Sequence, residues 1–271
     1  MSENEQVQEY EARSMAGFFG APLSWVALFG ALIGAMAIVP LIFYPGGGGY
    51  ASAGMIIIAP AAGMLLGPWA GAISATIGGV IGMMISPGAY PLGIVDIILS
   101  GTLISFTWGF MQPRFRKWLV ALFVIHLVVY YVFPYYWPAE AAGLERAQEP
   151  EWFFSMNAFI LGTILFIVVG PTIWRWFQSD TRWKMIVGLV GTNFFAVLLW
   201  EMPWVYPWRY LIRYPYTVSL VENYLAWIVT IIPIVAITSV ISYFLIRAVQ
   251  KAGLREIPYS WIEAYDFKWQ E

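Results

Sequence analysis

The polar side chains that could do chemistry in this chain are few, and they stand inside long apolar stretches. Asp96 and Ser100 are four residues apart, so on a helix they lie on one face. His126, the single histidine of the chain, precedes Tyr130 by the same step, and Asn157 stands in a third apolar stretch. Polar groups inside a membrane are costly and by default mark binding or transport sites. Asp96, His126, Tyr130 and Asn157 are therefore candidate ligand contacts.

The same inventory argues against an enzyme. One histidine cannot supply a bis-imidazole haem or a histidine-rich metal site. The absence of cysteine excludes disulfides, thiolate metal sites and cysteine nucleophiles. No HExxH, GxSxG or Walker motif is present. We expect no catalytic residue, no cofactor and no bound metal.

The composition indicates an integral membrane protein. Hydrophobic residues make up 60% of the chain and charged residues 11%, whereas soluble domains carry about 25% charged residues. No charged side chain occurs between Ser14 and Val95. The net charge of -2, without a basic cluster, gives no indication of nucleic-acid binding.

Eight apolar segments are predicted to cross the membrane, judged against a need for about 20 residues. They are Pro22–Phe43, Ala51–Leu66, Trp69–Ser86, Leu92–Met111, Trp118–Tyr136, Phe153–Trp174, Met185–Trp204 and Tyr224–Ile246. The second and third are short, which favours tilted or partly re-entrant segments. The expected fold is all-α, a polytopic transmembrane helical bundle of about eight spans.

The distribution of Lys and Arg predicts the orientation. Basic clusters follow the fourth, sixth and eighth segments, and even numbers of spans between them place all three clusters on the cytoplasmic side with both termini. The clusters are Arg114, Arg116 and Lys117; Arg175, Arg182 and Lys184; and Arg247, Lys251 and Arg255. The outer loops hold the exceptions, Arg146, Arg209 and Arg213.

The outer loops are rich in aromatic residues and contain a run of four glycines. Most of the aromatics fit an interfacial belt, but some, such as Tyr50 and Trp152, could line a pocket for a flat organic molecule. The glycines of residues 46–49 are read either as a mobile lid over an outward-facing site or as a plain connector. Glu201 is expected to pair with Arg209 or Arg213, and Asn193 to bridge helices.

A row of small residues marks the third apolar segment, in the sequence LGPWAGAISATIGGVIGMMIS. Gly67, Gly71, Ala75 and Gly79 are four residues apart, with Gly78 and Gly82 on a neighbouring line. Such rows let two membrane helices approach closely. Proline is well tolerated in a first helical turn. We therefore predict a tight turn at Gly67-Pro68, followed by a helix packed among others.

The first three segments resemble the substrate-binding subunit, or S component, of energy-coupling factor (ECF) vitamin transporters. The sequence ALFGALIGAMA, with Ala27, Ala31 and Ala35 four apart, resembles the family's AxxxA-type docking surface. The sequence LGPWAGAISATIGGVIG resembles its short second and third spans, joined by a Gly-Pro turn. The resemblance covers roughly residues 20–176. It implies that residues 21–176 form a six-helix domain. The prediction for the rest of the chain is a cytoplasmic segment 1–20, an additional transmembrane hairpin 177–250, which the family usually lacks, and a cytoplasmic tail 251–271.

The resemblance implies import of a vitamin-like small molecule across the plasma membrane of a prokaryote. The subunit would dock on a transmembrane coupling subunit with two cytoplasmic ATPases. The candidate partner interface is Ala27, Ala31, Ala35, Gly71 and Ala75. The candidate substrate contacts are Tyr50, Asp96, His126, Tyr130, Trp152 and Asn157. The alternatives are a structural subunit of a larger membrane complex and, more weakly, a membrane sensor domain.

Overall fold

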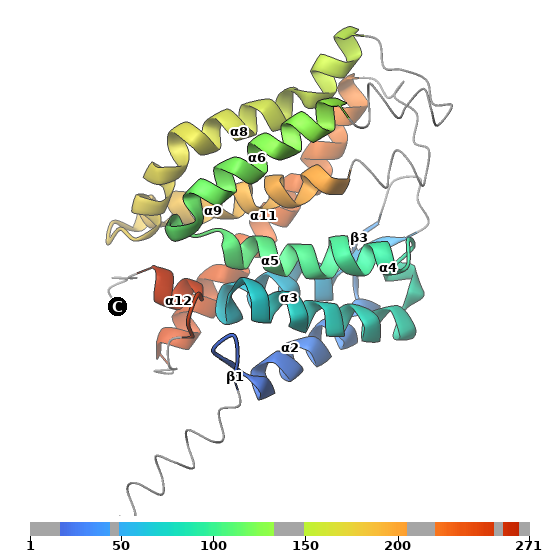
Figure 1. The fold of residues 1–271 in the computed structure, drawn as a ribbon, viewed down its shortest axis with the longest axis vertical. Helices are drawn as coiled ribbons and strands as arrows, with labels where there is room; N and C mark the ends of the chain where they lie inside the picture. The colour runs from blue at the N-terminus through green and yellow to red at the C-terminus, as the bar shows by residue number, and fades with distance from the viewer. Residues whose placement is uncertain (1–16, 44–48, 133–148, 205–219, 252–256, 266–271) are drawn as a thin grey trace, which may run out of the picture. The chain divides into compact units, whose positions relative to one another are not determined.

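The structure is a computed structural model that describes residues 17–43, 49–132, 149–204, 220–251 and 257–265. Side chains are described for these residues except 130–132, 149–158, 220–228 and 250. Most of the described residues are helical (Figure 1). They divide into two compact units. The first holds residues 17–41, 50–109 and 257–263, and the second holds the remaining described residues.

The elements of the first part of the chain are short strands and apolar helices. In chain order they are β1 (Gly17–Phe18), β2 (Ala21–Pro22), α2 (Leu23–Ala35), β3 (Pro40–Phe43), β4 (Tyr50–Ser52), α3 (Ala59–Ile85), α4 (Ile94–Ile97) and α5 (Leu103–Phe110). Strand β1 pairs antiparallel with β2, and β3 pairs with β4. The helical path also contains 3₁₀ turns at Met36–Ile38 and Pro87–Ala89, and π-helical turns at Gly54–Ile58 and Ile98–Thr102.

Longer helices make up most of the second unit. They are α6 (Arg116–Val132), α8 (Glu149–Phe177), α9 (Arg182–Glu201) and α11 (Leu220–Lys251). The short α12 (Trp261–Ala264) follows in the chain, and its first three residues belong to the first unit. Helix α8 packs against α9, and α11 packs against both. The ring of Phe166 forms the centre of this packing, with ring centroids 4.7 Å from Phe123, 5.2 Å from Phe195 and 5.6 Å from Trp174.

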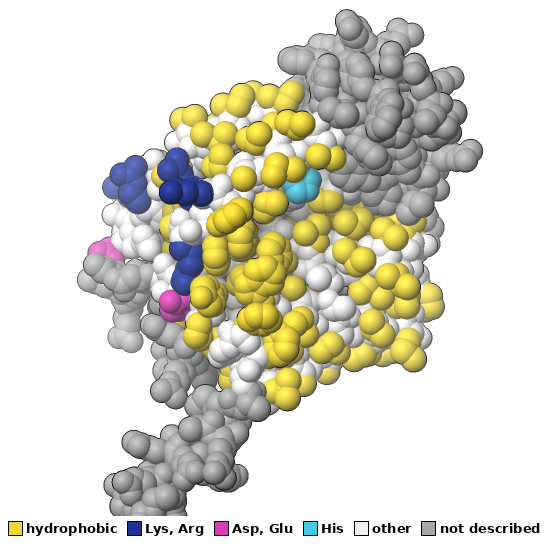
Figure 2. Space-filling model, in the orientation of Figure 1, with side chains coloured by type: hydrophobic (Ala, Val, Ile, Leu, Met, Phe, Trp, Pro, Cys, Tyr) yellow, Lys and Arg dark blue, Asp and Glu magenta, His cyan; other side chains and the backbone are white. Residues whose placement is uncertain are grey.

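Among the described residues, four helical stretches are long and apolar enough to cross a membrane, namely Gly54–Ile85, Phe159–Phe177, Arg182–Trp204 and Val229–Val249. A fifth candidate span would be formed by Ile94–Phe110 together with Pro113–Val129, two helical stretches that a short break separates. A shorter apolar helix covers Leu23–Ile38. Hydrophobic side chains cover much of the described surface in Figure 2. The expectation of an all-α protein with several membrane-spanning helices agrees with these elements, at four to five candidate spans.

The first predicted segment, Pro22–Phe43, is not helical throughout. Helix α2 ends at Ala35 and is followed by a 3₁₀ turn and then by β3. Pro40 explains this difference, because proline disfavours helical geometry at the preceding residue. Val39 is accordingly extended, with φ -98° and ψ 103°.

The predicted turn at Gly67-Pro68 is confirmed. Gly67 has φ 80° and ψ 174°, in the middle of the stretch named α3, and only glycine adopts a positive φ at little cost. A Cβ built on Gly71 would lie 2.8 Å from the Cα of Gly63, although eight residues of straight helix rise about 12 Å. The chain therefore doubles back at Gly67. Its two arms, before and after the turn, correspond to the second and third predicted segments.

Small residues join α2 to the second arm of α3, which runs parallel to it (Figure 1). A Cβ built on Gly78 would lie 2.5 Å from Ile33 Cβ and 2.7 Å from the Gly30 carbonyl oxygen. The hydroxyl of Ser74 donates a hydrogen bond of 2.8 Å to the carbonyl oxygen of Val26. The neighbouring line of small residues predicted from the sequence therefore faces α2.

The main row of small residues faces the helical run Ile94–Phe110, which is antiparallel to the second arm. A Cβ built on Gly79 would lie 2.8 Å from Ile97, and one on Gly71 would lie 2.7 Å from Ser105. Between them, a Cβ on Gly101 would lie 3.1 Å from the carbonyl oxygen of Ala75. The two rows thus pack against different helices. This confirms that the segment lies among other helices.

The C-terminal segment, predicted as a tail, contributes buried contacts to the first unit. Trp261 is fully buried, and its indole N–H donates a hydrogen bond of 2.7 Å to the carbonyl oxygen of Trp108. That carbonyl belongs to the last turn of α5, where backbone oxygens have no partner within the helix. The backbone oxygen of Tyr259 lies 3.0 Å from the position that a Cβ on Gly67 would take. The segment therefore covers the Gly67 turn and the end of α5.

Replacing Gly78 by alanine is expected to destabilise the protein by about 1–3 kcal/mol, because the added methyl group has to displace Ile33 and the backbone of α2. Thermal unfolding in detergent measures the change. The matched control is Gly88→Ala, whose Cβ would make an ordinary 3.4 Å contact with Tyr50. Equal unfolding midpoints for the two variants would show that the seam, the contact between α2 and the second arm of α3, is not closely packed.

Candidate functional site

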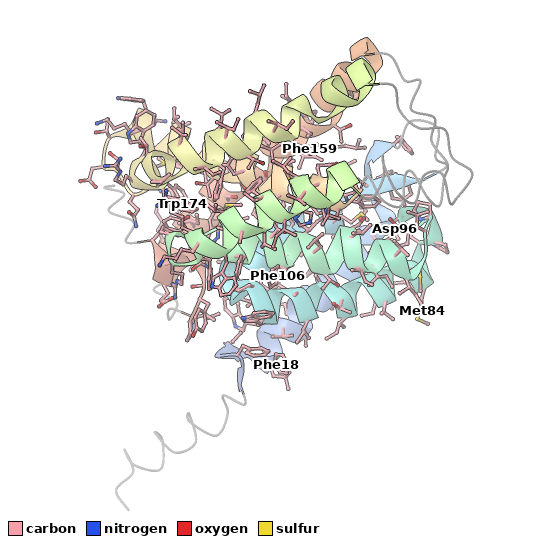
Figure 3. The ribbon with its side chains drawn as sticks, turned by 45° about the horizontal axis from the view of Figure 1, so that its top comes forward. Phe18, Met84, Asp96, Phe106, Phe159 and Trp174 are labelled. Atoms are coloured by element: carbon pink, nitrogen blue, oxygen red, sulfur yellow. The ribbon has the colours of Figure 1, made fainter. Side chains whose placement is uncertain are left out.

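The polar residues Tyr50, Ser86, Tyr90, Asp96 and Ser100 gather at one end of the first unit, and we name them the Asp96 cluster. They come from β4, the end of α3, the turn that follows it, α4 and the π-helical turn after α4. In Figure 3, Asp96 lies at the end of the helices that also carries Met84. Tyr50, which is distant in sequence, is thus brought to four residues that follow one another closely where α3 ends and the next helix begins.

The turn between α3 and α4 positions Asp96. Proline at 87 starts a 3₁₀ turn directly after Ser86, and Gly93, with φ 62°, starts the next helix. The Leu92 N–H donates a hydrogen bond to Oδ2 of Asp96. An acidic side chain in a first helical turn is favoured, because the backbone N–H groups there are unpaired and the helix dipole is positive. The local backbone therefore holds one carboxylate oxygen in place.

The other oxygen of Asp96, Oδ1, has no hydrogen-bond partner of good geometry among the described residues, although it is buried. The same is true of the Ser100 and Tyr90 hydroxyls. The exposed fractions are 0% for Asp96, 1% for Ser100 and 3% for Tyr90. Buried polar groups are ordinarily hydrogen-bonded. Three neighbouring exceptions therefore distinguish this cluster from ordinary helix packing.

Electrostatics tie Tyr90 to two predicted site residues. Burial, the nearby Asp96 and the nearby Tyr50, in that order, raise the pKa of Tyr90 to about 12. A phenol with that pKa stays protonated at physiological pH, so Tyr90 offers a neutral hydroxyl. Its oxygen lies 2.7 Å from the position that a Cβ on Gly82 would take. The absence of a side chain at Gly82 is what leaves room for the Tyr90 hydroxyl.

Tyr50 links β4 to the ends of the two neighbouring helical elements. Its hydroxyl donates a 3.0 Å hydrogen bond to the carbonyl oxygen of Ala37 and lies 2.6 Å from Ser86 Oγ. The phenol has one proton, so Ser86 donates to the Tyr50 oxygen. The chain between Ala37 and Tyr50 includes the predicted lid, residues 46–49, of which 46–48 lie outside the described residues.

A π-helical turn, Ile98–Thr102, follows Asp96 directly. Such turns are rare and frequently occur at functional sites. The Thr102 hydroxyl lies 3.2 Å from the Ile97 carbonyl oxygen, which accepts its hydrogen bond. The same hydroxyl lies 2.7 Å from the hydroxyl of Thr76 on α3. The irregular turn is therefore held by side-chain hydrogen bonds next to the cluster.

Of the predicted substrate contacts, Tyr50 and Asp96 fall in the cluster. His126 belongs to α6 of the second unit, where it is half-buried and its Nδ1 lies 2.8 Å from the Leu122 carbonyl oxygen. A carbonyl oxygen only accepts, so Nδ1 carries the proton in this contact. The side chains of Tyr130, Trp152 and Asn157 lie outside the described residues.

Two predictions concern polar residues of α9, Asn193 inside the helix and Glu201 at its last residue. The Asn193 amide donates a 3.0 Å hydrogen bond to the Leu189 carbonyl oxygen of its own helix. The expected partners of Glu201, Arg209 and Arg213, lie outside the described residues.

In the part of the chain that the structure describes, no three His, Asp or Glu side chains gather in a way that could hold a metal ion.

The predicted partner interface divides into two groups. Ala27, Ala31 and Ala35 are exposed on α2, whose opposite face packs on α3. Gly71 and Ala75 are buried against the Ile94–Phe110 run. The small size of Gly71 and Ala75 serves packing within the unit. Only the exposed alanine row therefore remains a candidate partner interface.

Ser86 and Tyr90 are cluster residues that sequence reasoning missed. Tyr90 is one of many aromatic residues near the ends of the apolar segments, and such residues are expected to form a belt at the membrane interface. The signal that could have found it is the sequence SPGAYPLG, a turn rich in proline and glycine. A turn that short returns its residues to the ends of the helices that it joins.

The hydrogen bonds of Tyr50 are expected to be coupled. Tyr50→Phe and Ser86→Ala should each destabilise the protein by about 0.5–1.5 kcal/mol. The double variant should lose less than the sum, because either change removes the same contact. Thermal or denaturant unfolding of the four proteins in detergent gives the coupling free energy. Strict additivity would mean that the two hydroxyls do not interact.

Comparison of the chain with protein-family models, with curated proteins and with solved structures gives no match in any of the three.

Proposed function

We propose that this chain is the substrate-binding membrane subunit of an ECF-type importer of a vitamin-like small molecule. It would reside in the plasma membrane of a prokaryote, with about eight spans and both termini in the cytoplasm. The observation that carries the proposal is the Asp96 cluster, an enclosed group of polar side chains with unsatisfied hydrogen-bonding capacity. Few groups other than a ligand's polar atoms would justify such a cluster among apolar helices.

The elements around the cluster suit a site that opens and closes. The Tyr50 hydroxyl holds β4 against Ser86 and the end of the α2 segment, and residues 46–49, the proposed lid, come just before Tyr50. Release of these two hydrogen bonds would free β4 from the helix ends at modest cost, since each contributes about 0.5–1.5 kcal/mol. Ligand would enter by this route, and closure would bury it beside Asp96.

Transport would require other chains. The exposed row Ala27, Ala31 and Ala35 gives α2 a smooth outer face, which another membrane helix could approach closely. In the proposed complex, a transmembrane coupling subunit docks on this row and two cytoplasmic ATPases supply the energy. The chain itself would bind and would not catalyse.

Ligand binding is tested first on the purified chain. A ligand present at 100 times its dissociation constant should stabilise the folded protein by about 2.7 kcal/mol. We expect one member of a panel of vitamins and vitamin precursors to raise the unfolding midpoint in detergent. The same ligand should give a smaller shift with Tyr50→Phe, which loosens closure. A panel without any shift would contradict a binding function.

Docking is tested by bulk on the alanine row. Ala31→Trp combined with Ala35→Trp should reduce uptake of the identified ligand in cells by about tenfold or more. The reason is that a steric cost of about 1–3 kcal/mol weakens docking, and about 1.4 kcal/mol corresponds to a factor of ten in affinity. Binding to the purified chain should be unchanged. The control pair is Leu161→Trp with Val168→Trp, which introduces the same two tryptophans at exposed positions of α8. Unchanged uptake with the alanine-row pair would contradict docking there.

The second candidate is a structural subunit of a larger membrane complex. The exposed alanine row favours it equally, since a smooth helix face serves permanent assembly as well as docking. The ligand panel separates the two functions. A structural subunit would lose complex assembly with the alanine-row variant and show no ligand-dependent stabilisation.

A further inference from the structure

The described residues of the first unit include no Lys, Arg or His. Asp96 is the single charged residue of this unit in residues 17–109. Asp96 is buried, and the Leu92 N–H and the nearby Ser100 hydroxyl act on its carboxyl group. No positive side chain is among the described groups that act on it. A carboxyl group that is removed from water either takes up a proton or, if it is ionised, pairs with a counter-charge. Within the described part of this unit, the chain does not provide one.

The geometry of the carboxylate leaves one oxygen available for that counter-charge. Oδ2 accepts the Leu92 N–H, whereas Oδ1 has no partner of good geometry among the described residues. The hydroxyl groups of Ser100 and Tyr90 are likewise buried and have no hydrogen-bond partner of good geometry among the described residues. Ser100 lies within hydrogen-bonding reach of Asp96, and Tyr90 within its electrostatic range. Oxygen atoms of this kind are the ligands that hard cations prefer.

We propose that Asp96 Oδ1, Ser100 Oγ and the Tyr90 hydroxyl bind a monovalent cation, either an alkali ion or the ammonium group of an organic ligand. This proposal deepens the proposed function, because it states the charge of the ligand that the Asp96 cluster binds. It rests on the proposed function in that both place the ligand at this cluster. A single carboxylate balances a single positive charge. Two neutral hydroxyl oxygens then complete the shell without adding further charge.

The helix that carries Asp96 is built in a way that suits a cation. The π-helical turn Ile98–Thr102 departs from the regular i to i-4 hydrogen bonding next to the site. Backbone carbonyl oxygens released by irregular helices coordinate cations inside membrane proteins. Hydroxyl groups further along, those of Thr102 and Thr76, pair with each other instead. Three of the eight buried side-chain polar atoms without a hydrogen-bond partner among the described residues lie in the Asp96 cluster, and Ser105 Oγ on the same helical run is another.

The test measures thermal unfolding of the purified full-length chain in detergent at neutral pH. Sodium, potassium and methylammonium chloride are each titrated against N-methyl-D-glucamine chloride at constant ionic strength. We expect a saturable rise in the unfolding midpoint with at least one small cation. A response to an alkali ion identifies a bound ion, and a response to methylammonium alone identifies the ammonium group of a ligand. A carboxyl that merely carries a proton would give no response, and that result overturns the proposal.

Variants assign the response to the cluster. Asp96→Asn should abolish it, and Ser100→Ala should raise the half-saturating concentration about two- to tenfold, the equivalent of one hydrogen bond. The matched control is Ser105→Ala, another buried serine of the same helical run, which should respond as the wild type does. A wild-type response from Asp96→Asn overturns the proposal. If that variant does not fold, Ser100→Ala decides, and an unchanged half-saturating concentration overturns it.

These outcomes are separate from those of the proposed importer function. The cation titration uses the chain alone, without coupling subunit, ATPases or vitamin. A cation response without any vitamin response leaves a cation site and removes the importer. A vitamin response without a cation response, and without loss in Asp96→Asn, leaves the importer and removes the cation site.

Discussion

The close approach of helices on both sides of the second α3 arm is the constraint on which the first unit depends. The arm contacts α2 on one side and the Ile94–Phe110 run on the other, and on both sides the contact is made where glycine leaves out a side chain. In a membrane there is little hydrophobic gain from joining helices, so van der Waals contact and hydrogen bonds must hold them. Interleaved small residues bring backbones near enough for both, as the Ser74 to Val26 hydrogen bond shows.

This packing also determines where the polar groups lie. Because the second arm is parallel to α2 and antiparallel to the next helix, the end of α3 meets the start of α4 at the same end of the unit. The Tyr90 hydroxyl occupies the space that Gly82 leaves open. Burial of Asp96 follows from the same contacts, since Ile97, its neighbour, packs on Gly79. The seam and the Asp96 cluster are therefore two consequences of one arrangement.

The sequence predicts the parts of this arrangement that depend on local patterns. Apolar segments locate the helices, and the Gly67-Pro68 pair locates the turn, because only glycine tolerates the φ observed there. The four-residue steps predict which faces are close-packed. The same reasoning identifies Asp96 and Tyr50, since a lone carboxylate and an aromatic beside a glycine run stand out in an apolar sequence.

What depends on contacts between distant residues could not be predicted. Nothing local shows that Trp261 is buried and donates to Trp108, because a short polar segment after the last span is typical of a free tail. Ala31 and Ala75 stand in equivalent small-residue patterns, yet one is exposed and the other buried. The difference arises from which helix each row meets, and periodicity does not contain that information.

The most direct measurement is disulfide formation across the two seams, in a chain that contains no native cysteine. The pairs Gly30→Cys with Ile77→Cys and Gly79→Cys with Ile97→Cys are suited to it. In both, the position of the Cβ built on the glycine lies 3.4 Å from the isoleucine Cβ, near the roughly 3.5–4.5 Å that disulfides require. The account predicts that mild oxidation in native membranes cross-links both pairs, whereas Gly30→Cys with Ile85→Cys, displaced by two turns along the same arm, does not cross-link. Absence of both cross-links, or equal cross-linking of the displaced pair, would contradict it.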